Sequence, residues 1–160
     1  MPSKMTIVEV NGLQFRCALT RTAGADRPWL LFSNSLMTDL TIWDEQVAAF
    51  ATRYNILRYD QRGHGGTAVP PDDCTFNILA DDVTALMDRW DLRTAIVVGV
   101  SMGGVTAMRM LARHPERVAG AAICDAGAVT PPDGREAWEE RMAVAREGGM
   151  QALVEPTIQR

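Results

Sequence analysis

The chain is poor in the residues that bind metal ions. Its 160 residues include two histidines and three widely spaced cysteines, Cys17, Cys74 and Cys124, with no C-x-x-C pair. Zinc sites need clustered cysteine and histidine ligands, so we expect no metal site. Three cysteines cannot all pair within one chain, and we expect reduced thiols in a reducing compartment.

Long apolar runs and an excess of basic charge are missing as well. No stretch approaches the roughly 20 apolar residues of a membrane span, and the first five residues lack the apolar core of a signal peptide. Lysine and arginine total 16 against 20 acidic residues, a formal net charge of −4. A basic footprint for nucleic acid is therefore excluded, and we expect a cytoplasmic protein that binds neither nucleic acid nor membrane.

The remaining composition, 47% hydrophobic and 22% charged residues, is typical of a globular domain. Asn11-Gly12 predicts a tight hairpin turn, with polar breaks expected over residues 22–28 and 131–134. Short apolar runs predict strands at residues 5–10, 13–19, 29–32, 55–59, 95–98 and 118–124, and helical periodicity predicts helices at 43–51, 77–90, 103–114 and 135–147. This alternation predicts an α/β fold with a mostly parallel sheet and flanking helices.

The sharpest motif is G-x-S-x-G at residues 99–103, centred on Ser101. It directly follows an apolar strand and directly precedes a helix, which is the setting of a nucleophile elbow. Glycine is expected at positions 99 and 103 because side chains there would collide across the turn. The alternative is a glycine-rich connection with an inert serine. Ser101 is the predicted catalytic nucleophile.

An acyl-transfer serine also needs donors for the oxyanion of its intermediate. One predicted donor is the backbone N–H of Met102, the residue after the nucleophile. The second is expected from the loop after the third strand, residues 33–36, where the N–H of Leu36 is our candidate. Alone, this Ser/Asn cluster is also typical of a plain turn.

Together these segments resemble the α/β-hydrolase fold, and more narrowly the 3-oxoadipate enol-lactonases. The matching segments are residues 33–36 (SNSL), 43–46 (WDEQ), 58–65 (RYDQRGHG), 80–83 (ADDV), 86–88 (LMD), 99–104 (GVSMGG) and 114–118 (HPERV). The resemblance implies hydrolysis of a small-molecule lactone or ester in aromatic catabolism, without a cofactor. Met37 departs from the glycine usual in these enzymes, and left-handed backbone is costly for methionine.

Neither histidine is expected to be the catalytic base. The resemblance makes the loop of His64 structural, with Asp60 and Arg62 pairing locally, and His114 ends the helix that follows the elbow, where it suits the helix C-terminus. In this fold the acid and the histidine follow the nucleophile in the chain, yet no histidine lies beyond His114. Asp125 is the one local acid that could stand in, although a strand-end aspartate is commonly solvated.

By the resemblance, residues 1–130 form the N-terminal part of the hydrolase core, truncated after the sixth strand, and residues 131–160 begin a helical lid. The substrate class carries a carboxylate, so a cationic residue of the lid is a candidate partner, with a solvated helix face as the alternative. Candidate substrate-binding residues are Asn34 of the loop and Trp138 and Arg141 of the lid helix, with Arg135 beside them.

Two rival functions stay open at this point. One is another hydrolase activity of the same fold, a carboxylesterase or a cofactor-free haloperoxidase. The other is a catalytically incomplete fragment or binding module, which the missing histidine favours. The strand at residues 118–124 is uncharged and free of proline, and without a seventh strand beside it we expect self-association through its edge.

Overall fold

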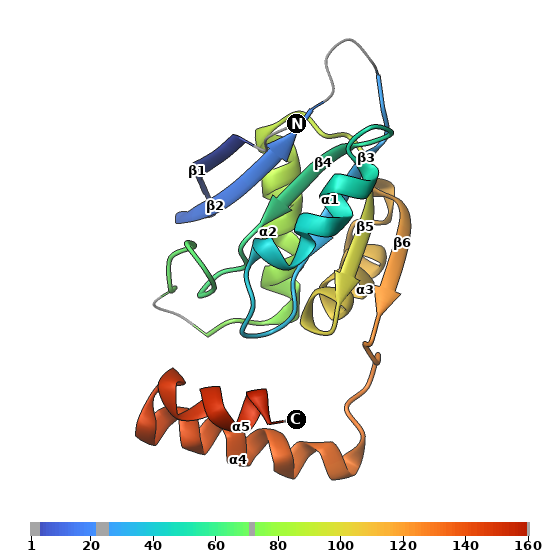
Figure 1. Cartoon of the computed structure of the whole chain (residues 1–160). Coiled ribbons are helices and arrows are strands. Elements are labelled where there is room, and N and C mark those ends of the chain that lie inside the picture. Colours follow the sequence, from blue (N-terminus) through green and yellow to red (C-terminus); the bar gives the residue numbers. More distant parts are fainter. Residues whose placement is uncertain (1–3, 22–25, 71–72, 160) are drawn as a thin grey trace. The chain divides into compact units, whose positions relative to one another are not determined.

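A computed structural model describes residues 4–21, 26–70 and 73–159. The chain divides into two compact units, residues 1–127 and 128–160. The first contains one six-stranded sheet in the order β1-β2-β4-β3-β5-β6. The strands are β1 (Lys4–Val10), β2 (Leu13–Thr20), β3 (Trp29–Ser33), β4 (Asn55–Tyr59), β5 (Ala95–Val100) and β6 (Val118–Cys124) (Figure 1).

The sheet is mixed, as the sequence predicts. β1 pairs antiparallel with β2, and β2 pairs antiparallel with β4, whereas the β4–β3, β3–β5 and β5–β6 pairs are parallel. Asn11 and Gly12 have φ values of 50° and 71°, the positive angles that a two-residue hairpin turn requires. The polar turn predicted over residues 22–28 lies largely outside the described residues.

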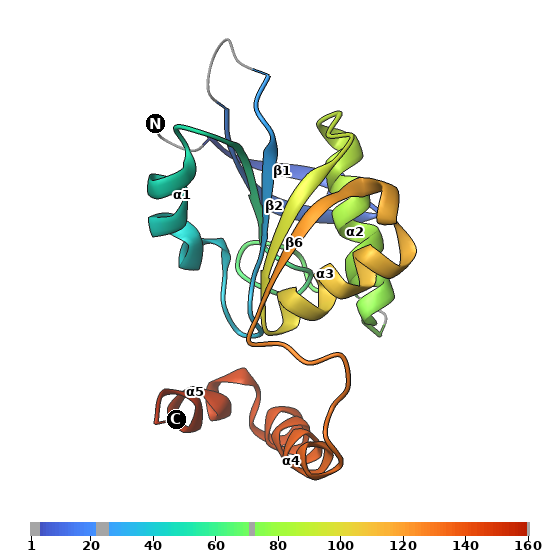
Figure 2. The same cartoon turned by 90° about the vertical axis from the view of Figure 1, so that its right-hand side faces the viewer.

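Helices cover both faces of the sheet. α1 (Asp44–Phe50) lies on one face, and α2 (Phe76–Arg89) and α3 (Met102–Arg113) lie on the other (Figure 2). Alternate residues of each strand point to opposite faces, which divides the core in two. Leu31, Leu57 and Val97 pack with the residues of α2 and α3. Phe32 and Ile56 pack with Trp43 and Val47 on the α1 side.

The second unit contains two α-helices joined by a 3₁₀ turn. α4 (Pro132–Gly148) is followed by the 3₁₀ turn η3 (Met150–Leu153) and by α5 (Val154–Ile158). The expected break over residues 131–134 is wrong in part, because Pro132 is the first residue of α4. Proline fits there, since the first helical N–H needs no partner within the helix.

Besides η3, the described residues contain two short 3₁₀ segments, η1 and η2. η1 (Leu40–Trp43) precedes α1, where the sequence predicts an α-helix from residue 43, and η2 (Pro115–Arg117) precedes β6. η1 begins at Leu40 because the Asp39 side chain accepts a hydrogen bond from the Thr41 N–H at 2.8 Å. That cap fixes the chain direction between the end of β3 and α1.

Candidate active site

The candidate site lies where the parallel strands β3, β5 and β6 end together. Ser33, the last residue of β3, pairs in register with Gly99, and Val100 pairs with Cys124, the last residue of β6. The segments that leave these strands therefore start from the same edge of the sheet. In open α/β sheets, ligands bind at the carboxyl ends of the strands.

Ser101 occupies a strained backbone conformation between β5 and α3. Its φ is 51° and its ψ is −115°, an arrangement that costs a non-glycine residue of order 1–3 kcal/mol and clusters at active sites. The Ser101 N–H donates to the Cys124 carbonyl at 2.9 Å, and its carbonyl accepts from the Val105 N–H at 3.1 Å. Within the described residues, no hydrogen bond engages the half-buried Ser101 hydroxyl.

The two glycines that flank Ser101 are required for different reasons. A Cβ at Gly99 would lie 2.1 Å from the Gly103 carbonyl oxygen, the collision across the turn that the sequence predicts. A Cβ at Gly103 would instead lie 2.0 Å from the Ser33 carbonyl oxygen. The prediction for Gly103 is therefore wrong in its cause: this glycine lets the first turn of α3 pack against the end of β3.

The two predicted oxyanion donors lie on the segments that this packing brings together. Met102 is the first residue of α3, and the first N–H groups of a helix have no partner within it. Leu36 lies in the turn after β3, next to Met37. Met37 has a φ of 62°, so it adopts the left-handed backbone that is costly for methionine.

Asn34 lies two residues before Leu36 and is fully buried. Its side-chain amide donates to the Tyr59 carbonyl at 2.9 Å, and its side-chain oxygen accepts from the Trp43 indole N–H at 2.8 Å. The Asn34 side chain is thus occupied on both sides by protein groups. These contacts hold the loop in place, and substrate binding by Asn34 stays a prediction.

Each of the two histidine rings contacts an oxygen atom of the protein. The His64 ring lies 3.1 Å from the Arg62 carbonyl oxygen within its own loop. The His114 ring contacts the Asp81 carboxylate of α2 at 2.7 Å, rather than serving only its own helix terminus. The pKa of Asp81 is lowered: its partial burial acts to raise it, but the hydrogen bonds from His114 and Arg113 outweigh that effect.

The predicted pairing of Asp60 with Arg62 is wrong. Asp60 forms an ion pair with Arg16 of β2 at 2.7 Å, and Arg62 pairs with Asp82 of α2 at 2.6 Å. Asp60 and Asp82 are buried, and each binds its partner from a different element. Two separate buried ion pairs therefore brace the loop of residues 60–67. Sequence separation hid these partners, because they come together only in the folded sheet.

Asp125 follows β6 directly, is exposed, and has a φ of 47°. The Cys124 carbonyl before it accepts the Ser101 N–H, so its backbone lies beside the elbow. Among the described residues, no hydrogen bond or ion pair engages its carboxylate. Its predicted role as a substitute acid stays a prediction.

Trp138 and Arg141 both lie on α4 in the second unit. The Arg141 guanidinium stacks 5.2 Å from the centre of the Trp138 ring and donates to the Thr157 hydroxyl at 3.3 Å. Arg135 pairs with Glu139 at 2.9 Å. Trp138 and Arg135 line an open pocket of about 710 Å³ within this unit. Substrate binding by Trp138 and Arg141 stays a prediction.

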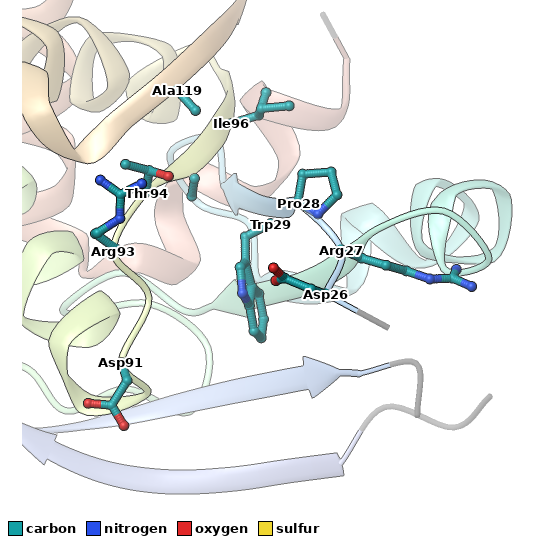
Figure 3. A pocket seen from close by; sticks show the side chains of 10 residues that line it. Asp26, Arg27, Pro28, Trp29, Asp91, Arg93, Thr94, Ile96 and Ala119 are labelled. Atoms are coloured by element: carbon teal, nitrogen blue, oxygen red, sulfur yellow. The ribbon is translucent and has the colours of Figure 1, made fainter. Parts of the chain in front are cut away.

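A second pocket, of about 490 Å³, lies at the opposite end of the sheet (Figure 3). It is lined by Trp29 and Ala95, the first residues of β3 and β5, with Asp26, Arg93 and Thr94. This pocket therefore lies at the start of the strands and is separate from Ser101.

The described residues show no grouping of three or more histidine, cysteine or acidic side chains able to hold a metal ion. Over the same residues, no helix has both the length and the apolarity needed to cross a bilayer.

Comparison with known proteins gives a consistent family. The chain is 35% identical over 136 residues to 3-oxoadipate enol-lactonase 2 of Acinetobacter baylyi, covering 85% of this chain and 50% of that protein. The enol-lactonase structure from Burkholderia xenovorans LB400 matches with a TM-score of 0.90 and 37% identity, covering 97% of this chain and 59% of that one.

An N-acyl homoserine lactone degrading enzyme also matches, at a TM-score of 0.75 and 28% identity, covering 92% of this chain and 54% of that one. The chain thus spans about half the length of the curated enol-lactonase it matches. A family model described as the alpha/beta hydrolase fold matches residues 28–160. With that match over most of its length, and with the sheet order and elbow described above, the chain belongs to the alpha/beta hydrolase fold family.

Proposed function

We propose that this chain carries the nucleophile and the oxyanion donors of a serine hydrolase that opens an enol-lactone. The observation that carries the proposal is the strained backbone of Ser101, at φ 51° and ψ −115°, between β5 and the N-terminus of α3. Such strain persists only where the surrounding structure enforces it. The similarity to two enol-lactonases supports the choice of substrate.

In the proposed reaction, the Ser101 hydroxyl oxygen attacks the lactone carbonyl carbon while a base removes its proton. The N–H groups of Leu36 and Met102 donate to the oxyanion of the tetrahedral intermediate. When the intermediate collapses, the ring C–O bond breaks and the enol oxygen takes a proton. The enol then becomes a ketone. Water attacks the acyl-serine, which releases the carboxylic acid and restores the Ser101 hydroxyl.

The base of this reaction is not assigned to either histidine of the chain. The rings of His64 and His114 bind the Arg62 carbonyl and the Asp81 carboxylate. Since the chain spans about half of a matched enol-lactonase, we place the catalytic histidine and its acid in residues outside these 160. We accordingly expect the 160 residues alone to give no repeated turnover. The three free cysteines suit a reducing compartment, and the cytoplasm is the proposed location.

The test measures turnover of the full chain, as its gene encodes it, on three substrates. These are 3-oxoadipate enol-lactone, an N-acyl homoserine lactone and a p-nitrophenyl ester. We expect the highest kcat/KM on the enol-lactone, and a loss of several orders of magnitude in Ser101→Ala. Thr84→Ala, which removes a half-buried hydroxyl that donates to the Ala80 carbonyl within α2, is the matched control.

The outcomes separate the parts of the proposal. Preference for the p-nitrophenyl ester would favour a carboxylesterase and reject the lactone. Near-normal turnover in Ser101→Ala would reject the nucleophile itself. Repeated turnover by the 160 residues alone, abolished by Ser101→Ala, would assign the base to His64.

A further inference from the structure

Three consecutive residues at the end of β4 contact the loop that carries Leu36. The Tyr59 carbonyl accepts from the Asn34 side chain at 2.9 Å. The Asp60 Oδ1 atom accepts from the Leu40 N–H at 2.7 Å, and the Gln61 side-chain amide donates to the Asn34 carbonyl at 2.6 Å. The segment between residues 34 and 40 is therefore fixed at both ends by the same turn of chain.

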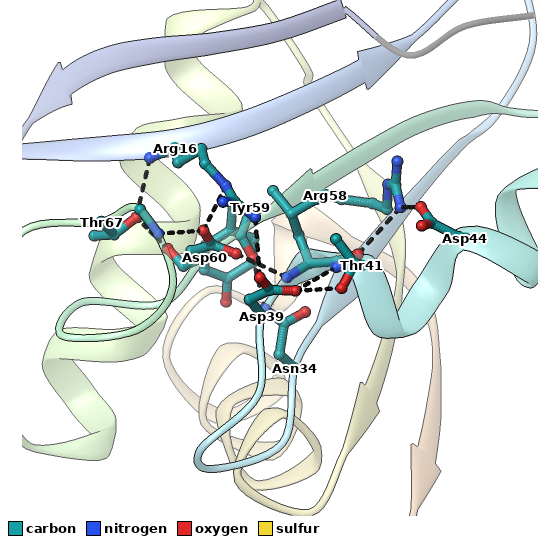
Figure 4. A network of polar contacts seen from close by, with 11 residues as sticks. Arg16, Asn34, Asp39, Thr41, Asp44, Arg58, Tyr59, Asp60 and Thr67 are labelled. Carbon is teal, nitrogen blue, oxygen red and sulfur yellow. Dashed lines mark hydrogen bonds and ion pairs between the residues drawn. The ribbon is translucent and has the colours of Figure 1, made fainter. Parts of the chain in front are cut away.

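Asp60 is the charged member of this group and is fully buried. Its Oδ2 atom accepts from the Gly66 N–H at 2.7 Å and pairs with the Arg16 Nε at 2.7 Å. One carboxylate thus joins the Leu36 loop, the glycine-rich loop and β2 (Figure 4). The contact is close: a Cβ at Gly65 would lie 2.2 Å from the Asp60 Oδ2 atom.

Between these two ends the loop contains a local hydrogen bond and a residue with left-handed backbone. Inside it, the Thr38 hydroxyl donates to the Ser35 carbonyl at 2.8 Å, and Met37 adopts its left-handed backbone. A strained turn relaxes unless its ends are held. At the C-terminal end, the Leu40 N–H has the Asp60 carboxylate as its partner.

We propose that Asp60 is a positioning residue for catalysis, which fixes the backbone of residues 35–39 through the Leu40 N–H and so aims the Leu36 N–H at the oxyanion. This inference rests on the proposed function, because it uses the oxyanion role of Leu36. Asp60 touches no reacting atom. Its carboxylate acts through the loop, and an oxyanion donor works only when it is held in place before the charge develops.

Asp60→Asn tests the inference because an amide has one acceptor oxygen where the carboxylate has two. The Oδ2 side offers two donors, one of them the cationic Arg16, whereas the Oδ1 side offers only the Leu40 N–H. Charge-assisted hydrogen bonds are the stronger ones, so the amide oxygen turns toward Arg16 and Gly66. The amide N–H₂ then faces the Leu40 N–H, and the loop loses this anchor, while the Arg16–Asp39 ion pair and the Arg58 bond to the Leu40 carbonyl remain.

Asp82→Asn is the matched control. Asp82 is a second buried aspartate paired with an arginine, Arg62, and it also accepts from the Asn11 side chain at 3.0 Å. No described contact joins Asp82 to residues 33–40. Both variants lose a buried ion pair, so both are expected to unfold at a lower temperature.

The kinetic arm uses the full chain well below the unfolding temperature of either variant. For Asp60→Asn we expect kcat to fall by about ten- to a hundredfold with KM within about twofold, since losing an oxyanion donor outright costs about 10²–10³ in kcat. The affinity for a boronic acid, whose adduct with Ser101 carries a tetrahedral anion, falls in parallel. Asp82→Asn keeps the kcat and the boronate affinity of the parent. Equal kcat values in Asp60→Asn and the parent, or equal losses in both variants, would overturn the inference.

The second arm reads the loop without turnover, by amide hydrogen exchange at Leu36 and Leu40. Asp60→Asn should speed exchange at both amides, while Asp82→Asn should leave them near the parent rates. Unchanged exchange in Asp60→Asn overturns the inference whatever the activity. Full activity in Ser101→Ala instead overturns the proposed function, and the exchange rates still show whether Asp60 anchors the loop. The two failures are therefore distinguishable.

Discussion

The Ser101 N–H donates to the Cys124 carbonyl at 2.9 Å, so the candidate nucleophile is hydrogen-bonded to the last residue of the edge strand β6. Within the described residues, this bond links the elbow to a strand that is paired on one side only. Gly104 reinforces the link, since a Cβ at that position would lie 2.6 Å from the Ala126 Cβ. The conformation of Ser101 therefore depends on β6 as well as on β5 and α3.

The packing of Gly103 predicts a sharp difference between two glycine substitutions. Gly103→Ala places a methyl group 2.0 Å from the Ser33 carbonyl oxygen, whereas Gly120→Ala meets nothing closer than 3.9 Å. We expect Gly103→Ala to lower the unfolding temperature and to abolish labelling of Ser101 by a fluorophosphonate in the full chain. Gly120→Ala should leave both unchanged. Equal behaviour of the two variants would contradict the close packing of α3 on β3.

The left-handed backbone of Met37 predicts that a glycine variant is more stable than an alanine variant, the reverse of the usual order. Met37→Gly and Met37→Ala lose the same side-chain contacts beyond Cβ, but only glycine relieves a φ of 62°. At ordinary positions alanine is the more stable by about 0.5–1 kcal/mol. Here we expect Met37→Gly to be the more stable by about 1 kcal/mol, the cost of a left-handed non-glycine residue. Urea unfolding measures the free energy of unfolding of both variants. A larger value for Met37→Ala than for Met37→Gly would contradict backbone strain at this position.

The three cysteines should differ in reactivity with pH. Burial first, and the nearby charge of Asp60 second, raise the pKa of Cys17 to about 12, whereas Cys74 and Cys124 are exposed. The thiolate is the reactive form of cysteine. At pH 8 about one ten-thousandth of the Cys17 side chains are thiolates, since the ionised fraction falls about tenfold for each pH unit below the pKa.

A disulfide reagent at pH 8 should therefore titrate two thiols rapidly and the third slowly. Between pH 7 and 10, in the folded protein, the slow rate should rise about tenfold per unit. Cys17→Ala is the control and should remove the slow phase alone. Three equally fast thiols in the folded parent would show that Cys17 is accessible.

The edge of β6 predicts self-association of the 160-residue chain. In the part of the chain that the structure describes, β6 pairs only with β5. Most residues of β6 are exposed, and Ile123 is 40% exposed. An uncharged edge without proline is a template for further strands. Light scattering should show association in the parent and less of it in Ala122→Lys, with Ala112→Lys on α3 as the control for added charge. A monodisperse parent would refute the prediction.

The sequence reveals contacts that are local and misses those that are not. Short apolar runs and the Asn11-Gly12 turn predicted the six strands of the described sheet. The G-x-S-x-G motif predicted a strand–turn–helix setting around Ser101, which the structure confirms, while its role as nucleophile stays a prediction. The partners of Asp60 were misassigned, because Arg16 and Leu40 reach it from 44 and 20 residues away. The sequence indicates only that Asn34 lies in a loop, and the folded chain shows its side-chain amide bonded to the Tyr59 carbonyl and the Trp43 indole.

The contact between Gly103 and Ser33 has a consequence for how this family diversifies. The spacing between the nucleophile's helix and the loop of Leu36 is set by one backbone resting on another, with no side chain between them. Side chains elsewhere around the site are therefore expected to tolerate exchange without a change in this spacing. One matched structure is described as an enol-lactonase and another as an N-acyl homoserine lactone degrading enzyme, so the matched proteins of this fold act on more than one class of lactone.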